Sequence, residues 1–184
     1  MQVEKTSLAE VFVLIPHRFG DSRGWLSETW NAARMSEAGL DLQFVQDNHS
    51  FSAHKGTLRG LHYQRSPRTQ DKLVRCTRGA IFDVAVDIRR GSPTYGRWVG
   101  DELTSVNGRQ VLIPRGFMHG FVTLTEDCEV QYKCTDFYAP DCEGSIRWDD
   151  PTVSIDWRLG GATPLLSVKD SVAPFLADFE SPFT

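Results

Sequence analysis

The sequence predicts an all-β fold of the sandwich or barrel type, with a few short helices. Its apolar residues fall in short segments, several of which alternate with polar residues as half-buried strands do. Its 15 glycines and 9 prolines are spread along the chain as turn signals between these segments. Periodicity typical of helices is sparse. Short strands separated by turns are the usual pattern of a β-sandwich or barrel.

The predicted elements follow one another without a repeat or a linker, so we expect one domain over residues 1–184. A short helix is expected from Asn31, which can cap it, to Ala38, with Gly39 as its stop. A second is expected near Ser171–Asp178, where Pro174 limits it. The predicted strands are Val11–Ile15, Thr57–Gln64, Lys72–Arg75, Ala80–Asp87, Arg97–Leu103, Gln110–Ile113, Gly120–Leu124 and Glu129–Thr135.

Composition limits the classes of function. A chain of 184 residues can bury a core without help from disulfides or metals. The net charge of −4 argues against nucleic acid as a partner, so an anionic ligand must meet a local cluster of Lys and Arg.

No apolar stretch predicts a membrane span, and the N-terminus lacks the pattern of a signal peptide. We therefore expect a cytoplasmic protein with free thiols. The cysteines form no CxxC pair and are predicted to be small core residues: Cys76, Cys128, Cys134 and Cys142.

Alternation along two strands predicts which side chains point inward. In the segment 128–134, Tyr132 shares a face with Cys128, Val130 and Cys134, so its ring should point into the barrel. Lys72 shares a face with Val74 and Cys76, so it should point inward too. A lysine in a barrel interior is costly unless it is paired or functional.

His62 lies near the middle of another predicted strand. Taken alone, such a histidine is most often a core residue with a satisfied hydrogen bond. Arg59 has the opposite parity to His62. The two can therefore share one cavity only if Gly60 marks a β-bulge or if Arg59 acts from the rim.

The segment Ile113–Phe121, with its Pro-x-Gly turn and His119, resembles the second motif of the cupin superfamily of jelly-roll barrels. The first cupin motif supplies His-x-His followed by Glu, and these residues bind a metal together with the later histidine. Here Gln64 takes the place of the second histidine, and no His or Glu follows until beyond Lys72. Zinc and iron sites need three or four such ligands. The resemblance thus implies a cupin-like jelly-roll barrel without a metal, in which His62 is free to act as a base.

Motifs spread over nearly the whole chain resemble the dTDP-4-dehydrorhamnose 3,5-epimerase family of sugar-nucleotide epimerases. They occur in the family's order, and together they are far more specific than any one alone. The motifs lie in Phe19–Gly24 with Glu28, Gln46–Ser50, Leu58–Gln64, Lys72–Cys76, Asp83–Asp87, Ile113–Phe121, Tyr132–Asp136, Tyr138–Pro140 with Glu143, Trp148–Pro151 and Leu166–Asp170.

The resemblance implies a reaction. The family epimerises C3 and C5 of dTDP-4-dehydro-6-deoxy-D-glucose to give dTDP-4-dehydro-L-rhamnose, in dTDP-L-rhamnose biosynthesis, with neither metal nor organic cofactor. Both carbons flank the C4 ketone, which acidifies their C–H bonds. The chemistry needs a base on one face of the sugar, an acid on the other, and a positive charge near the C4 oxygen.

Four residues match the family's catalytic groups. His62 matches the base, and imidazole, with an ordinary pKa of about 6.5, suits that role at neutral pH. Asp170 matches the aspartate that orients the base. Tyr132 matches the acid, because a phenol with an ordinary pKa of about 10 keeps its proton at pH 7. Lys72 matches the cation that stabilises the enolate. The inward directions of Tyr132 and Lys72 agree with this independently.

The resemblance also implies contacts to the nucleotide. Arg23, Arg59 and Lys169 match its positive groups, and Tyr138 matches the ring that stacks on thymine. The remaining matches are polar contacts: Glu28, Gln46, Asn48, His119 and Glu143. Without the resemblance, Arg23 and Glu28 would be interpreted as solvated charges, Gln46 and Asn48 as turn residues, and Tyr138 as a loop anchor.

The family also implies a homodimer with strand exchange near the N-terminus. The segment Val11–Ile15 is apolar enough to be the exchanged strand. Arg23 and Glu28 would then act in the site of the neighbouring subunit.

Three alternative functions remain open at this point. A relative could epimerise only one carbon of a related dTDP-4-keto-6-deoxy sugar, with the same fold and catalytic residues. A metal-dependent cupin isomerase or dioxygenase is disfavoured by the missing His-x-His. A non-catalytic sugar-nucleotide binder would have no use for a base, an acid and an oxyanion charge together.

Overall fold

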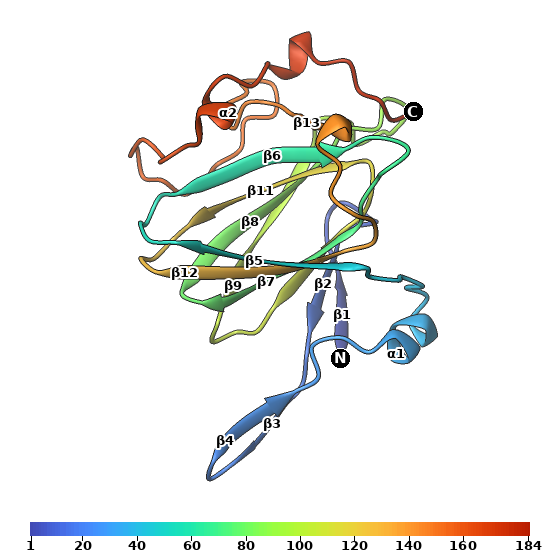
Figure 1. The fold of residues 1–184 in the computed structure, drawn as a ribbon, viewed down its shortest axis with the longest axis vertical. Helices are drawn as coiled ribbons and strands as arrows, with labels where there is room; N and C mark the ends of the chain where they lie inside the picture. The colour runs from blue at the N-terminus through green and yellow to red at the C-terminus, as the bar shows by residue number, and fades with distance from the viewer.

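The computed structural model describes residues 1–184 as two antiparallel sheets that face each other, with a small hairpin projecting from them (Figure 1). The six-stranded sheet has the order β1 (Gln2–Lys5), β2 (Phe12–Ile15), β10 (Gln110–Ile113), β7 (Lys72–Arg78), β12 (Cys128–Cys134), β5 (Gln46–Ser52). The five-stranded sheet has the order β13 (Glu143–Ser145), β6 (Leu58–Gln64), β11 (Phe117–Thr123), β8 (Ala80–Asp87), β9 (Trp98–Thr104). The predicted all-β, barrel-like fold is confirmed.

Every predicted strand is present, and two of them, Ala80–Asp87 and Gln110–Ile113, have the predicted bounds. The structure adds strands that the apolar pattern did not indicate: β1, β5, β13 and the hairpin β3 (Arg18–Asp21) and β4 (Gly24–Ser27). Strand β5 does alternate, but its half-buried residues are polar, beginning with Gln46 and Asn48. An apolar pattern therefore does not detect a strand whose inner face serves a polar cavity.

The two predicted helices have different outcomes. Helix α1 (Ala32–Glu37) is capped by Asn31, whose side chain accepts a hydrogen bond from the Arg34 N–H, as predicted. The second prediction is wrong: no helix runs through Ser171–Asp178. Helix α2 (Val168–Ser171) begins earlier, at the Ser167 cap, and the chain after Pro174 forms only the short 3-10 helix Leu176–Asp178. The helix lies nearer the N-terminus than predicted because the Ser167 hydroxyl caps it there and Pro174 does not allow it to continue.

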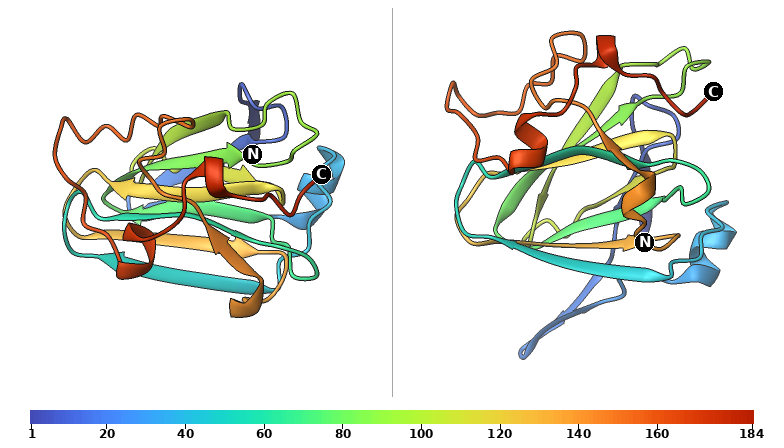
Figure 2. Two further views of the ribbon diagram at one scale, coloured as in Figure 1. Left: turned by 90° about the horizontal axis from the view of Figure 1, so that it is seen from above. Right: turned by 45° about the horizontal axis from the view of Figure 1, so that its top comes forward.

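The apolar side chains form two main cores, one on each face of the five-stranded sheet. The first lies between the sheets and includes Val74, Cys76 and Val130. The second lies outside, where the chain after β13 covers the sheet, and includes Phe82, Val84 and Val86. Figure 2 shows this C-terminal chain crossing over β6 and β11. Because both faces of β8 are buried, its sequence is almost continuously apolar. All four cysteines are buried and unpaired, as predicted.

The β3–β4 hairpin stands away from the sheets (Figure 1). Strand β2, which covers most of the segment Val11–Ile15, pairs within this chain with β1 and β10. None of the helices has the length and apolar character that crossing a membrane would require.

Candidate active site

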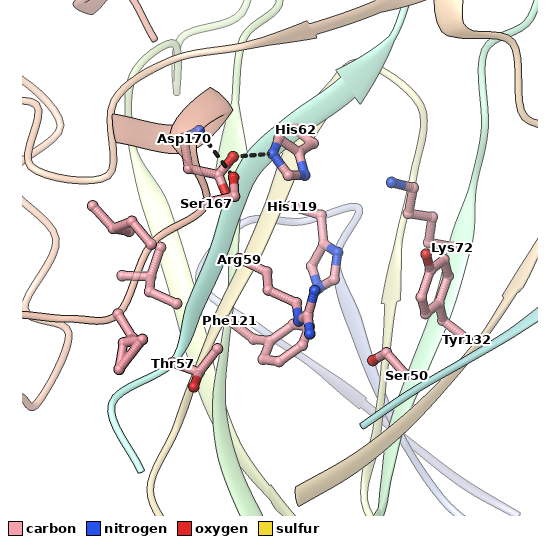
Figure 3. Close-up of a pocket in the computed structure, with 13 residues that line it drawn as sticks. Ser50, Thr57, Arg59, His62, Lys72, His119, Phe121, Tyr132, Ser167 and Asp170 are labelled. Atoms are coloured by element: carbon pink, nitrogen blue, oxygen red, sulfur yellow. Dashed lines mark hydrogen bonds and ion pairs between the residues drawn. The ribbon is translucent and has the colours of Figure 1, made fainter. Parts of the chain in front are cut away.

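A cavity of about 420 Å³ opens between the two sheets, on the side of β5 and β6 (Figure 3). Strands of both sheets line it, and the chain around α2 closes one side. Most of the lining is polar or charged, although it lies beside the main core. Its lining residues are Ser50, Thr57, Leu58, Arg59, His62, Lys72, His119, Phe121, Tyr132, Leu165, Leu166, Ser167 and Asp170.

Strand alternation places Lys72 and Tyr132 in this cavity, as predicted from their parity with Val74 and Val130. The Lys72 Nζ lies 5.9 Å from the centre of the Tyr132 ring. Burial lowers the pKa of Lys72, because an ammonium group loses hydration there. Burial raises the pKa of Tyr132, so the phenol keeps its proton through neutral pH. The pair thus offers a proton donor beside a cation with few neutralising partners.

A β-bulge allows Arg59 and His62 to face the same cavity. His62 lies opposite His119, whereas Arg59 lies opposite Phe121, so Gly60 and Leu61 together oppose one residue of β11. This is the condition that the parity of the two residues required. The Arg59 guanidinium is held at the end of β5, where it donates to Ser52 Oγ at 3.3 Å and to the Phe51 carbonyl at 3.2 Å.

Replacement of the bulge glycine by alanine tests this geometry. Gly60 has φ +127°, and a Cβ built there would lie 2.5 Å from the Gly120 Cα, which is backbone. We expect Gly60→Ala to destabilise the fold by about 3 kcal/mol and to lower the melting temperature by roughly 5–10 °C. Turnover at a temperature where the variant is folded should also fall, because Arg59 and His62 shift relative to each other. Gly91→Ala, at an unstrained φ with its nearest neighbour at 3.8 Å, is the control and should behave as the wild type.

His62 forms a tight pair with Asp170, which is buried in α2 (Figure 3). The His62 Nε2 lies 2.5 Å from Asp170 Oδ1, and the Asp170 N–H donates to the Ser167 hydroxyl at 3.1 Å. Burial alone would raise the pKa of Asp170, but the hydrogen bond and charge of His62, with smaller contributions from Ser167 and the Gly60 N–H, lower it overall. With Asp170 ionised, its Oδ1 accepts a hydrogen bond from the His62 Nε2–H, and Nδ1 is left free to accept a proton. This arrangement suits a general base.

His119 forms a second histidine–carboxyl pair at the bottom of the cavity. Its Nε2 lies 2.7 Å from Asp83 Oδ2, and both residues are buried. The sequence predicts a role for His119 but none for Asp83, which lies in the motif Asp83–Asp87.

Five predicted contact residues form a connected group between β5, β13 and α2, outside the lining itself. Lys169 Nζ lies 2.5 Å from Glu143 Oε2, which also accepts from the Tyr138 hydroxyl at 3.1 Å. The Tyr138 N–H donates to Gln46 Oε1 at 2.8 Å, and Gln46 Nε2 donates to Asn48 Oδ1 at 3.1 Å. Tyr138 itself is exposed.

Arg23 and Glu28 are not brought to the cavity of their own chain. Arg23 lies between β3 and β4, pairs with Asp21 at 2.6 Å, and has 88% of its side chain exposed. Glu28 pairs with Arg34 at 2.9 Å, beside α1.

The cavity also contains polar residues to which the sequence analysis gave no role: Ser50, Thr57 and Ser167. The Ser50 Oγ is buried and has no hydrogen-bond partner. Ser50 has the same parity as Gln46 and Asn48, so the alternation of β5 would have located it once that segment was recognised as a strand. No group of three or more His, Cys, Asp or Glu side chains is placed to hold a metal ion.

Comparisons with known proteins agree with this geometry. The family model described as dTDP-4-dehydrorhamnose 3,5-epimerase matches residues 5–178. A dTDP-4-dehydrorhamnose 3,5-epimerase of Pseudomonas aeruginosa is 52% identical over 179 residues, which cover 97% of each chain. A crystal structure of dTDP-6-deoxy-D-glucose-3,5-epimerase from Legionella pneumophila in complex with dTDP-4-keto-L-rhamnose has a TM-score of 0.92 and 48% identity, and the match covers 97% of this chain and 94% of that one.

A more distant similarity concerns a single-centre enzyme. The structure of a 3'-monoepimerase from Streptomyces bikiniensis in complex with dTDP-quinovose has a TM-score of 0.88 and 37% identity, over 94% of this chain and 87% of that one. The higher identities are to the double epimerases. With a family model that spans most of its length and relatives about half identical to it, this chain belongs to the dTDP-4-dehydrorhamnose 3,5-epimerase family.

Proposed function

We propose that this protein epimerises dTDP-4-dehydro-6-deoxy-D-glucose at C3 and C5, giving dTDP-4-dehydro-L-rhamnose for dTDP-L-rhamnose biosynthesis. One observation carries the proposal: His62 and Tyr132 enter the cavity from opposite sheets (Figure 3). A sugar ring between them would have a base on one face and an acid on the other. Epimerisation needs this arrangement, because the proton must return to the face opposite the one it left.

The three central groups divide the chemistry. His62 Nδ1 removes the proton from C5 or C3, and the electron pair moves onto the C4 oxygen as the enolate forms. Asp170 holds the His62 ring and stabilises the imidazolium. Lys72 meets the enolate oxygen, and because burial has stripped its hydration, its charge gains most when that oxygen becomes negative. Tyr132 then returns a proton to the carbon from the opposite side.

The groups around the cavity suit the nucleotide. Arg59 and Lys169 supply positive charge for the diphosphate. The exposed ring of Tyr138 can stack on thymine, a contact worth about 1–3 kcal/mol in other base-binding proteins. Gln46, Asn48 and Glu143 hold this group of residues together and offer further polar contacts.

Proton NMR of dTDP-4-keto-6-deoxyglucose incubated with the protein in D₂O, without added metal, tests the proposal. We expect the signals at both C3 and C5 to be lost as deuterium enters. Loss at one carbon would support the second candidate, a single-centre epimerase, which the similarity to the 3'-monoepimerase favours. Binding without any exchange would point to a different sugar or to a binding role. Absence of both exchange and binding would contradict the proposal.

We also propose that two copies of the chain associate through the β3–β4 hairpin. Phe19, Trp25 and Leu26 on this hairpin are all more than half exposed, and the hairpin pairs with neither sheet. A two-stranded hairpin alone is marginally stable in water, so its apolar side chains need a surface to cover them. Arg23 is exposed on this hairpin, so its guanidinium could reach the partner's cavity.

Mixing His62→Ala with Arg23→Ala, each of which we expect to be inactive alone, tests this arrangement. In a heterodimer of His62→Ala and Arg23→Ala chains, one of the two cavities would have an intact His62 and receive an intact Arg23 from the other chain. We expect the mixture, after dissociation and reassociation, to recover about a quarter of wild-type activity, as random pairing of two-fold dimers gives. Two His62→Ala preparations mixed in the same way are the control. If the mixture stays inactive although sedimentation shows that it is dimeric, Arg23 does not act in the partner's cavity.

A further inference from the structure

Helix α2 carries one half of the His62–Asp170 pair, although little of the helix packs against the rest of the protein. It has four residues, Val168–Ser171, and Asp170 is the only one of them that is buried. Val168 is 83% exposed. A single helical turn is not stable in water by itself. The position of the Asp170 carboxyl group therefore depends on the hydrogen bonds that hold the start of the helix.

Ser167 makes those hydrogen bonds. Its backbone is extended, at φ −72° and ψ 158°, as is usual for an N-cap residue, and its hydroxyl oxygen accepts from the Asp170 N–H at 3.1 Å. Its carbonyl oxygen accepts from the Ser171 N–H, also at 3.1 Å. Ser167 thus holds the helix at two points, and one of them is the residue that contacts the base.

The chain just before Ser167 is fixed to the strand that carries His62. The Leu165 N–H donates to the Gly56 carbonyl, and the Leu165 carbonyl accepts from the Leu58 N–H, both at 2.9 Å. Leu58 is the first residue of β6, and His62 follows it on the same strand. Ser167 therefore stands between a segment that is fixed to β6 and the helix that carries the carboxyl group.

The Ser167 side chain lines the active-site cavity beside the two residues of the pair (Figure 3). Dashed lines in the figure run from Asp170 to both His62 and Ser167. Burial acts to raise the pKa of Asp170, but the hydrogen bond and charge of His62 and, to a smaller extent, Ser167 bring it below its usual value. The hydroxyl therefore favours the ionised form of Asp170, which is the form that accepts from the His62 Nε2–H.

We propose that Ser167 is a positioning residue for the base: its hydroxyl holds Asp170 in the orientation that keeps His62 in its Nε2–H tautomer. The inference rests on the proposed epimerase function. In that tautomer Nδ1 has the free electron pair that removes the substrate proton. A loosely held Asp170 would leave fewer molecules with the base in this form, because the hydrogen bond at one ring nitrogen decides which nitrogen carries the proton. Ser167 acts only through Asp170 and exchanges no proton with the substrate.

Ser167→Ala tests this role, with Ser167→Thr and Ser171→Ala beside it. We expect Ser167→Ala to lower kcat about five- to tenfold, as the loss of an N-cap hydrogen bond gives, and to leave KM within about twofold. Ser167→Thr keeps a hydroxyl acceptor and should have at least about half of the wild-type kcat. Ser171→Ala is the matched control, because the exposed Ser171 hydroxyl donates only to the Val168 carbonyl of the same helix, at 2.8 Å. Its kcat should equal that of the wild type.

Nitrogen NMR of the free protein gives a second readout that needs no substrate. Long-range ¹H–¹⁵N correlations through the ring C–H protons of His62 show which ring nitrogen carries the proton. At a pH where the ring is neutral, we expect the Nε2–H form to dominate in the wild type and in Ser171→Ala. In Ser167→Ala the Nδ1–H form should rise at least about threefold.

Wild-type kcat and wild-type tautomer populations in Ser167→Ala would overturn the inference. A fall in kcat with unchanged tautomer populations would also overturn it: a raised KM would then make the hydroxyl a substrate contact, and an equal fall in Ser171→Ala would reflect only the stability of α2. If Ser167→Ala did not fold, Ser167→Gly would replace it, since glycine lacks the hydroxyl but is tolerated at an N-cap. Failure of the proposed function would look different, because the wild type would be inactive on the sugar nucleotide while the tautomer change in Ser167→Ala persisted.

Discussion

Replacement of His62 by alanine is expected to abolish proton exchange at both C3 and C5. General-base catalysis contributes about a hundredfold to ten-thousandfold in other enzymes, and kcat should fall within that range or below detection. The residues proposed to contact the nucleotide lie elsewhere, at Arg59, Lys169 and Tyr138, so the affinity for dTDP should change little. Steady-state assays and NMR exchange in D₂O measure the first effect, and calorimetric titration with dTDP measures the second.

Asp170→Asn is the companion variant for this prediction. An asparagine can hold the His62 ring but does not stabilise the imidazolium, so we expect an intermediate loss of kcat with little change in KM. Near-normal turnover of His62→Ala would show that the base assignment is wrong. The next histidine to consider would then be His119, which lies opposite it in the same cavity.

The sequence predicted those parts of the site that follow from local alternation. The parity of Lys72 and Tyr132 placed both in the interior, because each shares a strand face with small apolar residues. The bulge at Gly60 was a condition drawn from the parity of Arg59 and His62, and the strand register meets it. Such features can be predicted because they depend only on residues that are close together in the sequence.

Other features depend on contacts between distant segments and could not be predicted from local pattern. The His62–Asp170 pair joins residues 108 positions apart, and the family resemblance, not any spacing, suggested it. Strand β5 was missed because its inner face serves a polar cavity instead of the core. Asp83 lay within a recognised strand motif, but only the three-dimensional arrangement shows its bond to His119.

Replacement of Tyr132 by phenylalanine is expected to separate proton removal from inversion. The ring keeps its packing against the core between the sheets, so the fold and the Lys72 environment should persist. His62, on the opposite sheet, can still remove and return a proton from its own side. We therefore expect exchange at one or both carbons to continue in D₂O, while inversion at C5 falls by about a hundredfold or more, because no phenol donates from the other face.

The contrast between exchange and inversion gives this variant its value, because a damaged cavity would lose both together. NMR of the recovered sugar measures them in one sample: deuterium content reports proton removal, and the coupling pattern reports configuration. Burial raises the pKa of Tyr132 but lowers that of Lys72, so inversion by the wild type should decline at high pH through loss of the Lys72 charge, before the phenol loses its proton. If Tyr132→Phe inverted both centres normally, the acid would have to be another hydroxyl, and Tyr138, whose own hydroxyl donates to Glu143 beside the cavity, would be tested next. If instead both exchange and inversion were lost while dTDP still bound, Tyr132 would be acting with Lys72 on the enolate oxygen, and the base on the opposite sheet could not function without it.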